Sequence, residues 1–224
     1  MAMTTSGLLS LESDALNAAQ AQFHVQVAFL TGQSDAPRCA LSPVQRAFLD
    51  ALPLPASAKL PLNFPYDAGT APWRHVPLIA ASVSNARLYM ASRRPDFAAR
   101  HAPDVLRVLA RAPRTLILAG SAGLEILVNL RLPREALERV HVLAYGPVAR
   151  RLPDCACLLV QGRRDWVSRW WFPAVDHRVE CTHLDYLESP EVMALCVQTL
   201  RRMTERELTP STLTERELTT RGAS

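Results

Sequence analysis

The chain has 224 residues, of which 49% are hydrophobic and 21% charged, and its formal net charge is +4. A chain of this length and composition can bury most of the apolar surface that its unfolded form exposes, so we expect one globular domain with a real core. No apolar run approaches the roughly 20 residues that span a bilayer, which excludes a predicted membrane span.

The charged residues and the cysteines indicate which partners and which cellular compartment the sequence favours. The basic residues are nearly all arginine and stand singly or among acidic residues, which disfavours nucleic-acid binding but does not repel an acidic partner. No basic residue precedes the short apolar patch near the start, so we expect no secretory signal and a cytoplasmic protein. The odd number of cysteines, without CxxC spacing, predicts reduced thiols, no metal site and no cofactor.

Short, continuous apolar runs predict a mostly parallel sheet of about six strands, because strands covered by helices on both faces need no polar alternation. The expected strands are, in chain order, residues 25–31, 60–64, 115–119, 140–145, 157–161 and 177–181. Glycine follows four of these runs, at Gly32, Gly120, Gly146 and Gly162. In open α/β sheets, ligands bind outside the carboxyl ends of the strands, so this pattern places the site at that edge.

Helical stretches alternate with the strands, which predicts the α/β class. They are expected at residues 42–52, 76–92, 103–112, 122–130 and 190–203. We divide the chain into a helical N-terminal segment (1–22), an α/β domain (23–203) and a polar tail (204–224). The hexad TERELT occurs twice in that tail, which is expected to be disordered.

The strongest local motif is Ala119-Gly120-Ser121-Ala122-Gly123, which lies between an apolar strand and a predicted helix. Small neighbours around a serine allow a tight turn that lifts the hydroxyl above the sheet. The turn also sets Ser121 at a helix N-terminus, where the Ala122 N–H can face a developing oxyanion. The alternative interpretation is that Ser121 only caps the helix.

Two further segments carry polar residues after strands. Asp165 comes three residues after Gly162, and His183 follows the last expected strand in the stretch Thr182-His183-Leu184-Asp185-Tyr186. The three segments together resemble the α/β-hydrolase superfamily, whose nucleophile, acid and histidine follow this chain order at strand ends. The resemblance covers about residues 25–203.

The resemblance implies roles for individual residues. Ser121 is the expected nucleophile, Asp165 the orienting acid and His183 the base. Because the stretch from Asp165 to His183 is short and leaves little room for a helix, Asp176 is the alternative acid. The chain departs from the family in two ways. The turn around Ser121 has Ala119 where the family usually has its first glycine. The sheet is expected to lack the family's first strands, and the chain leaves no room for a large lid.

The oxyanion hole needs a second donor, which the family takes from the loop after an early strand. Gly32 matches the family's glycine there, and the Gln33 N–H is the expected donor, although an ordinary turn explains the loop equally well. Trp166 and Tyr66 are candidate substrate-binding residues with Gly32. If such aromatic residues line the site, the pocket is apolar and suits an acyl chain.

The expected activity is hydrolysis of an acyl ester or thioester by a Ser-His-Asp triad. A small-molecule acyl substrate presented by an acyl carrier protein, in a lipid or secondary-metabolite pathway, is favoured because a small lidless chain resembles the thioesterase branch. A carboxylesterase that acts on small esters is the first alternative. A hydrolase-like assembly or binding protein without catalysis is the second.

Overall fold

The computed structural model describes residues 24–35, 38–67, 69 and 71–208. These residues form a six-stranded sheet in the order β2-β1-β3-β4-β5-β6, and each pair of neighbouring strands is parallel. The strands are β1 (Val25–Thr31), β2 (Lys59–Asn63), β3 (Arg114–Gly120), β4 (Val140–Tyr145), β5 (Ala156–Gly162) and β6 (His177–Val179). The predicted α/β class and the predicted sheet are therefore confirmed.

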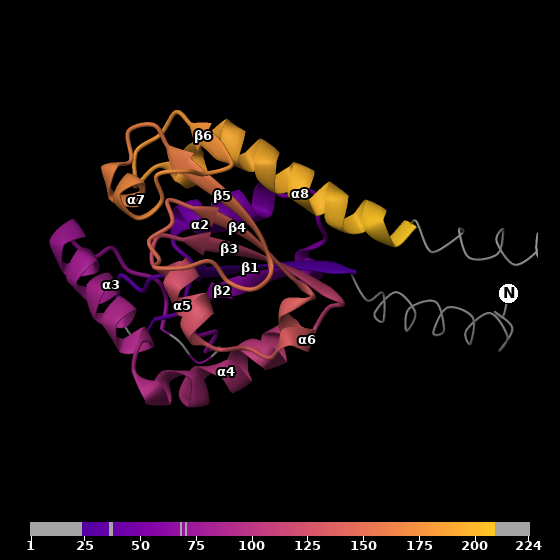
Figure 1. Cartoon of the computed structure of the whole chain (residues 1–224), viewed down its shortest axis with the longest axis horizontal. Helices are drawn as coiled ribbons and strands as arrows, with labels where there is room; N and C mark the ends of the chain where they lie inside the picture. Colours follow the sequence, from indigo (N-terminus) through magenta and orange to yellow (C-terminus); the bar gives the residue numbers. More distant parts are fainter. Residues whose placement is uncertain (1–23, 36–37, 68, 70, 209–224) are drawn as a thin grey trace, which may run out of the picture.

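Helices cover both faces of this sheet (Figure 1). They are α2 (Pro43–Ala51), α3 (Leu78–Ser92), α4 (Pro95–Leu109), α5 (Gly123–Asn129), α6 (Arg134–Leu137), α7 (Trp166–Trp171) and α8 (Pro190–Leu208). Buried residues of α2 and α8 pack on one face of the sheet, and those of α4, α5 and α6 pack on the other. Helices α3 and α7 lie beyond the carboxyl ends of the strands (Figure 1).

The strand register brings the loops that follow β1, β3 and β4 to one place. Thr31, the last residue of β1, pairs with Gly120 at the end of β3, and Gly120 pairs with Tyr145 at the end of β4. Because parallel strands all end at the same edge, the segments after these residues leave the sheet side by side.

Close packing at Gly123 fixes where α5 begins. A Cβ atom at this position would lie 1.8 Å from the carbonyl oxygen of Leu30 in β1, so only glycine fits. The backbone of α5 therefore touches the end of β1, and the first turn of α5 lies next to the Gly32 loop.

The helices differ from the sequence-based expectation in two places. Helix α4 begins at Pro95, with Pro103 inside it, because Phe97 in its first turns is buried with Val105 and Leu109 on one face. Both prolines suit a first helical position, and tertiary packing selects the earlier one. Helix α7 forms directly after Asp165, in a segment that was expected to leave little room for a helix.

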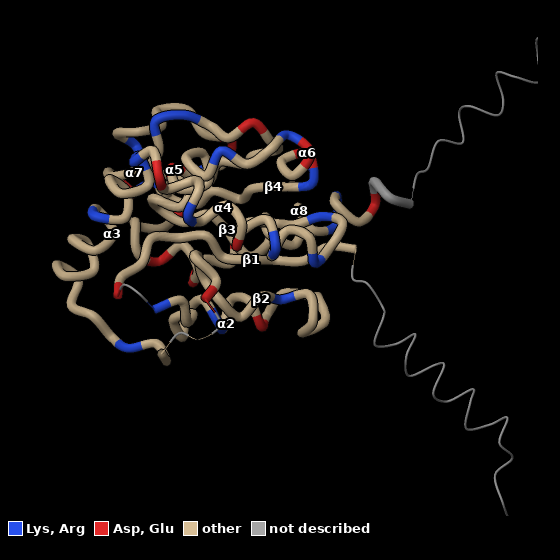
Figure 2. Tube along the Cα trace, turned by 90° about the horizontal axis from the view of Figure 1, so that it is seen from below, with Lys and Arg blue, Asp and Glu red and all other residues tan. Residues whose placement is uncertain are grey.

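The expected terminal segments lie mostly outside the described residues. Helix α8 continues to Leu208, so residues 204–208 are helical and do not belong to a disordered tail. Residues 1–22 and 209–224 are not described. Along residues 24–208, with the gaps given above, no helix is long and apolar enough to cross a membrane. Positions of Lys and Arg alternate with positions of Asp and Glu along the Cα trace (Figure 2).

A buried carboxylate ties α5 to the end of α3 and to the loop after β4. Glu125 of α5 is 1% exposed and accepts hydrogen bonds from Arg93 at 3.2 Å, from Arg150 at 2.9 Å and from the Asn129 amide at 3.2 Å. The Arg150 backbone N–H also donates to it, at 3.0 Å. Burial alone would raise the pKa of Glu125, but these hydrogen bonds and the Arg150 charge hold it below its usual value of 4.5.

We expect Glu125→Gln to destabilise the fold by about 2 kcal/mol at neutral pH, because charge-assisted hydrogen bonds to a buried carboxylate are lost. The folded pKa is depressed, so this stabilisation is complete above about pH 5 and is lost as pH falls through the folded pKa. Urea unfolding at pH 7 and pH 4 should therefore show a smaller difference from wild type at the lower pH.

Glu138→Gln is the matched control, because the Glu138 side chain is 62% exposed and pairs with Arg134 on its own helical turn. Its cost should stay below about 0.5 kcal/mol. Equal costs for the two variants would show that the Glu125 hydrogen bonds do not stabilise the fold.

Candidate active site

Ser121 occupies the sharp turn between β3 and α5. Its φ angle is 51°, in the left-handed region that residues with a side chain rarely adopt. Gly120 before it packs under the Tyr145 ring, where an added Cβ would lie 2.5 Å from a ring carbon. The strained turn and the missing side chain together hold the Ser121 hydroxyl above the sheet edge, in the layout of a nucleophile elbow.

Side chains far apart in the sequence form a hydrogen-bonded chain at this edge. His183 Nε2 lies 3.1 Å from Ser121 Oγ, and His183 Nδ1 lies 2.9 Å from Asp165 Oδ2. The segments involved follow β3, β5 and β6, so the parallel sheet brings them together. The structure thus unites the expected nucleophile, acid and base at hydrogen-bond distance.

The Asp165 carboxylate is fully buried and has a partner for each oxygen. It caps α7, with Oδ1 accepting from the Ser168 N–H at 3.0 Å. Oδ2 accepts from His183 Nδ1 and from the Tyr186 hydroxyl, the latter at 2.6 Å. Burial raises the pKa of Asp165, but these hydrogen bonds outweigh it and hold the pKa below its usual value, so the group is ionised at neutral pH.

Tyr186 is a part of the site to which the sequence analysis gave no role. Its hydroxyl donates to Asp165 Oδ2 and accepts from the Gly162 N–H at 2.6 Å. Burial and the neighbouring Asp165 carboxylate raise the Tyr186 pKa, which keeps the hydroxyl protonated as a donor. Its ring also lies against Gly146, whose φ is 55° and where a Cβ would meet the ring at 2.7 Å.

Two other aspartates, which are close to His183 in the sequence, have different hydrogen-bond partners. Asp176, the alternative acid, accepts from the Leu159 backbone N–H at 2.7 Å. Asp185 accepts from the backbone N–H and the hydroxyl of Thr182, at 2.5 and 2.8 Å. Neither of these carboxylates is hydrogen-bonded to the imidazole, whereas Asp165 is.

The expected oxyanion donors belong to adjacent segments. Ala122 precedes the first residue of α5, and Gln33 follows Gly32 after β1; the contact at Gly123 holds these two segments together. The Gln33 side chain points into its own loop, where Nε2 donates to the Arg38 carbonyl at 3.3 Å. Only its backbone N–H is therefore a candidate donor toward Ser121.

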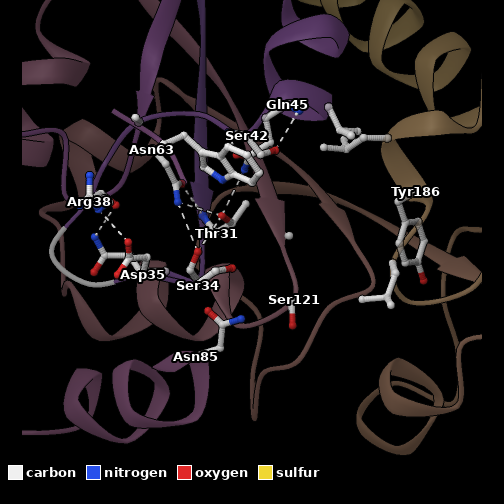
Figure 3. A pocket seen from close by; sticks show the side chains of 18 of the residues that line it. Thr31, Ser34, Asp35, Arg38, Ser42, Gln45, Asn63, Asn85, Ser121 and Tyr186 are labelled. Carbon is white, nitrogen blue, oxygen red and sulfur yellow. Dashed lines mark hydrogen bonds and ion pairs between the residues drawn. The ribbon is translucent and has the colours of Figure 1, made fainter. Parts of the chain in front are cut away.

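A cavity of about 320 Å³ opens over the Ser121 hydroxyl (Figure 3). Its walls come from the loops after β1, β2, β3 and β6, with the start of α2 and one residue of α3. Gly32 lines it, as expected. Tyr66, which packs on Phe64, and Trp166, which is 75% exposed on α7, are not among its lining residues.

The cavity lining mixes polar residues with apolar and aromatic ones such as Val44, Trp73 and Leu184. Among its polar residues are Ser34, Asp35, Arg38, Asn63, Arg74 and Asn85. Asn85 comes from α3 and packs so closely on Gly32 that a Cβ there would lie 2.3 Å from its Oδ1. Helix α3 thus closes one side of the site, a contact that no sequence motif indicates.

The described residues place no group of three or more His, Cys, Asp or Glu side chains where it could hold a metal ion. The five cysteines, all within the described residues, form no disulfide bond, and three of them are buried. The cavity presents a serine hydroxyl and an imidazole held by an ionised carboxylate, an arrangement that can support nucleophilic attack on a carbonyl.

Comparisons with known proteins give structural matches alone, since no family model and no curated protein matches the sequence. The crystal structure of TT1662 from Thermus thermophilus is 16% identical with a TM-score of 0.43, over 82% of this chain and 90% of that chain. ATU1826 from Agrobacterium tumefaciens, of unknown function and provisionally named an alpha/beta hydrolase, is 13% identical with a TM-score of 0.42, over 85% and 91%.

We expect Tyr186→Phe to lower the free energy of unfolding at pH 7 by about 1–3 kcal/mol, because Asp165 loses a donor and the buried Gly162 N–H loses its acceptor. Urea unfolding measures the change. Tyr66→Phe removes the hydroxyl of a half-buried tyrosine that packs on Phe64, and it is the matched control. An equal effect in both variants would show that the bonds to Asp165 and Gly162 add no stability.

Proposed function

We propose that this protein is a serine hydrolase that cleaves an acyl ester or thioester, with Ser121 as nucleophile, His183 as base and Asp165 as orienting acid. The observation that carries the proposal is the continuous hydrogen-bonded chain from Ser121 Oγ through the His183 ring to the buried Asp165 carboxylate. A serine that only capped a helix would need neither the positive φ nor the imidazole.

The acid determines which tautomer of the histidine is present. Because Asp165 is ionised and accepts at Oδ2, the neutral imidazole carries its proton on Nδ1 and presents the lone pair of Nε2 to Ser121. His183 can then remove the hydroxyl proton as Ser121 Oγ attacks the carbonyl carbon. The Asp165 carboxylate stabilises the imidazolium that results and does not itself take the proton.

The backbone amides complete the first half of the reaction. The N–H groups of Ala122 and Gln33 hold the oxyanion of the tetrahedral intermediate, and His183 returns its proton to the leaving alcohol or thiol. Water then attacks the acyl-serine with His183 again as base, which releases the carboxylic acid and restores the Ser121 hydroxyl. One ester or thioester and one water thus yield one acid and one alcohol or thiol.

For the substrate we retain an acyl thioester on a carrier protein as the first choice and a small ester as the alternative. The cavity of about 320 Å³ lies at the small end of the range for ligand pockets, which favours a short acyl group over a long fatty chain.

The test is covalent labelling with a fluorophosphonate, followed by mass spectrometry to locate the modified residue. We expect one adduct, on Ser121, and loss of both labelling and hydrolysis of activated acyl esters in Ser121→Ala. Ser82→Ala, which removes an exposed hydroxyl on α3, is the control and should behave as wild type. Unchanged turnover by folded Ser121→Ala would refute the proposal.

We expect Asp165→Asn to lower kcat by roughly ten-thousand-fold, as when a triad acid is replaced by its amide, because the amide favours the wrong imidazole tautomer. Asp176→Asn is the comparison, since its carboxylate bonds to the Leu159 N–H and does not contact His183. Steady-state kinetics on an activated ester, with circular dichroism to check folding, measures both. A mild effect of Asp165→Asn with a severe effect of Asp176→Asn would reassign the acid.

A further inference from the structure

The cavity over Ser121 carries an excess of positive charge at one end. Its charged lining residues are Arg38, Arg74 and Asp35, with His183 at the other end beside Ser121. Two guanidinium groups thus face one carboxylate. In Figure 3 the Arg38 and Asp35 side chains lie at the left of the view and Ser121 lies near its centre, with Ser34 and Asn85 between them.

The two arginines share the single Asp35 carboxylate. Arg74 donates to it with two nitrogens, Nε at 2.5 Å and Nη2 at 3.1 Å. Arg38 Nε lies 2.7 Å from the same Oδ2 that Arg74 Nε contacts. The Arg74 hydrogen bond is the main cause that lowers the pKa of Asp35, so Asp35 is ionised at neutral pH and offsets one positive charge only.

A further hydrogen bond joins the two loops that carry these residues. Arg38 Nη1 donates to the Pro72 carbonyl at 2.7 Å, which links the loop after β1 to the loop after β2. The side chain of Arg74 remains 64% exposed, so its guanidinium stays within reach of a ligand although Asp35 orients it. A guanidinium has five N–H donors, of which the bonds to Asp35 use two on Arg74.

We propose that this end of the cavity binds an anionic group of the substrate through Arg74 and Arg38, so that the enzyme prefers acyl substrates with a negative charge remote from the scissile carbonyl. The inference rests on the proposed function. A planar guanidinium oriented by a neighbouring carboxylate suits a second carboxylate or a phosphate, and the uncompensated charge of the pair favours an anion over a cation or a neutral group.

The anion has two chemical sources, and matched substrates distinguish them. On the acyl side, 4-nitrophenyl hydrogen glutarate carries a carboxylate and 4-nitrophenyl valerate is its neutral counterpart of equal chain length. On the leaving-group side, the valerate ester of 4-hydroxybenzoate carries the anion, and the valerate ester of 4-hydroxybenzamide is neutral. We expect the anionic member of one pair to have at least a tenfold higher kcat/KM.

Variants then assign that preference to the arginines. Arg74→Gln and Arg38→Gln should each reduce the ratio of anionic to neutral kcat/KM about tenfold or to unity, as expected for the loss of a charge-assisted hydrogen bond. Arg74→Lys should restore part of the preference because it keeps the charge. Arg100→Gln, on α4 and outside the cavity, is the control and should keep all of it.

Binding to Ser121→Ala tests the subsite without turnover. Glutaramate, with one carboxylate and one amide, should bind at least tenfold more tightly than neutral valeramide, and 4-hydroxybenzoate more tightly than 4-hydroxybenzamide if the anion belongs to the leaving group. Arg74→Gln in the same background should abolish the difference. Calorimetry gives the dissociation constants.

The outcomes separate the two proposals. Equal kcat/KM and equal binding within both pairs, or a preference that persists in Arg74→Gln and Arg38→Gln, would overturn the anion site while hydrolysis of neutral esters still supported the serine hydrolase. Charge-dependent binding by a protein that hydrolyses none of the esters would support the anion site and count against the proposed activity. Thermal unfolding of each variant excludes a collapsed loop as the cause.

Discussion

The buried Asp165 carboxylate is the group on which the site depends. One oxygen caps α7, and the other receives His183 and Tyr186, so a single ionised group fixes a helix start, an imidazole and a tyrosine hydroxyl. Tyr186 in turn bonds to the Gly162 N–H in the loop that leads to Asp165. Burying an ionised carboxylate costs free energy, because the charge loses its water. Here each oxygen of Asp165 accepts from a donor that also orients the site.

At three glycines, neighbouring atoms lie too close for any side chain to fit, and these contacts hold the other wall of the cavity. Gly123 touches the Leu30 carbonyl, Gly120 lies under the Tyr145 ring, and Gly32 lies against Asn85. These contacts keep the Ser121 turn, the Gly32 loop and α3 together, so the cavity is formed by the packing of the sheet edge and needs no separate lid domain.

Charge is used differently at the two ends of the cavity. Beside Ser121, an ionised Asp165 is shielded from water and has one imidazole and two other donors around it. At the far end, Asp35 is shared by Arg38 and Arg74, and Arg74 stays largely exposed. In the proposed mechanism the first arrangement fixes the geometry for proton transfer, and in the proposed anion site the second leaves positive charge available to a ligand, because exposed guanidinium groups can exchange partners at little cost.

The sequence by itself determined the parallel sheet, the turn at Ser121 and the chain order of Ser121, Asp165 and His183, because apolar runs, glycine positions and strand ends are local features. Tertiary structure decided the rest. Packing of Phe97 sets the start of α4, the donors around Asp165 distinguish it from Asp176, and loops remote in sequence line the cavity with Arg38 and Arg74 in place of Tyr66 and Trp166. These outcomes depend on contacts between segments far apart along the chain, which periodicity and motif spacing do not encode.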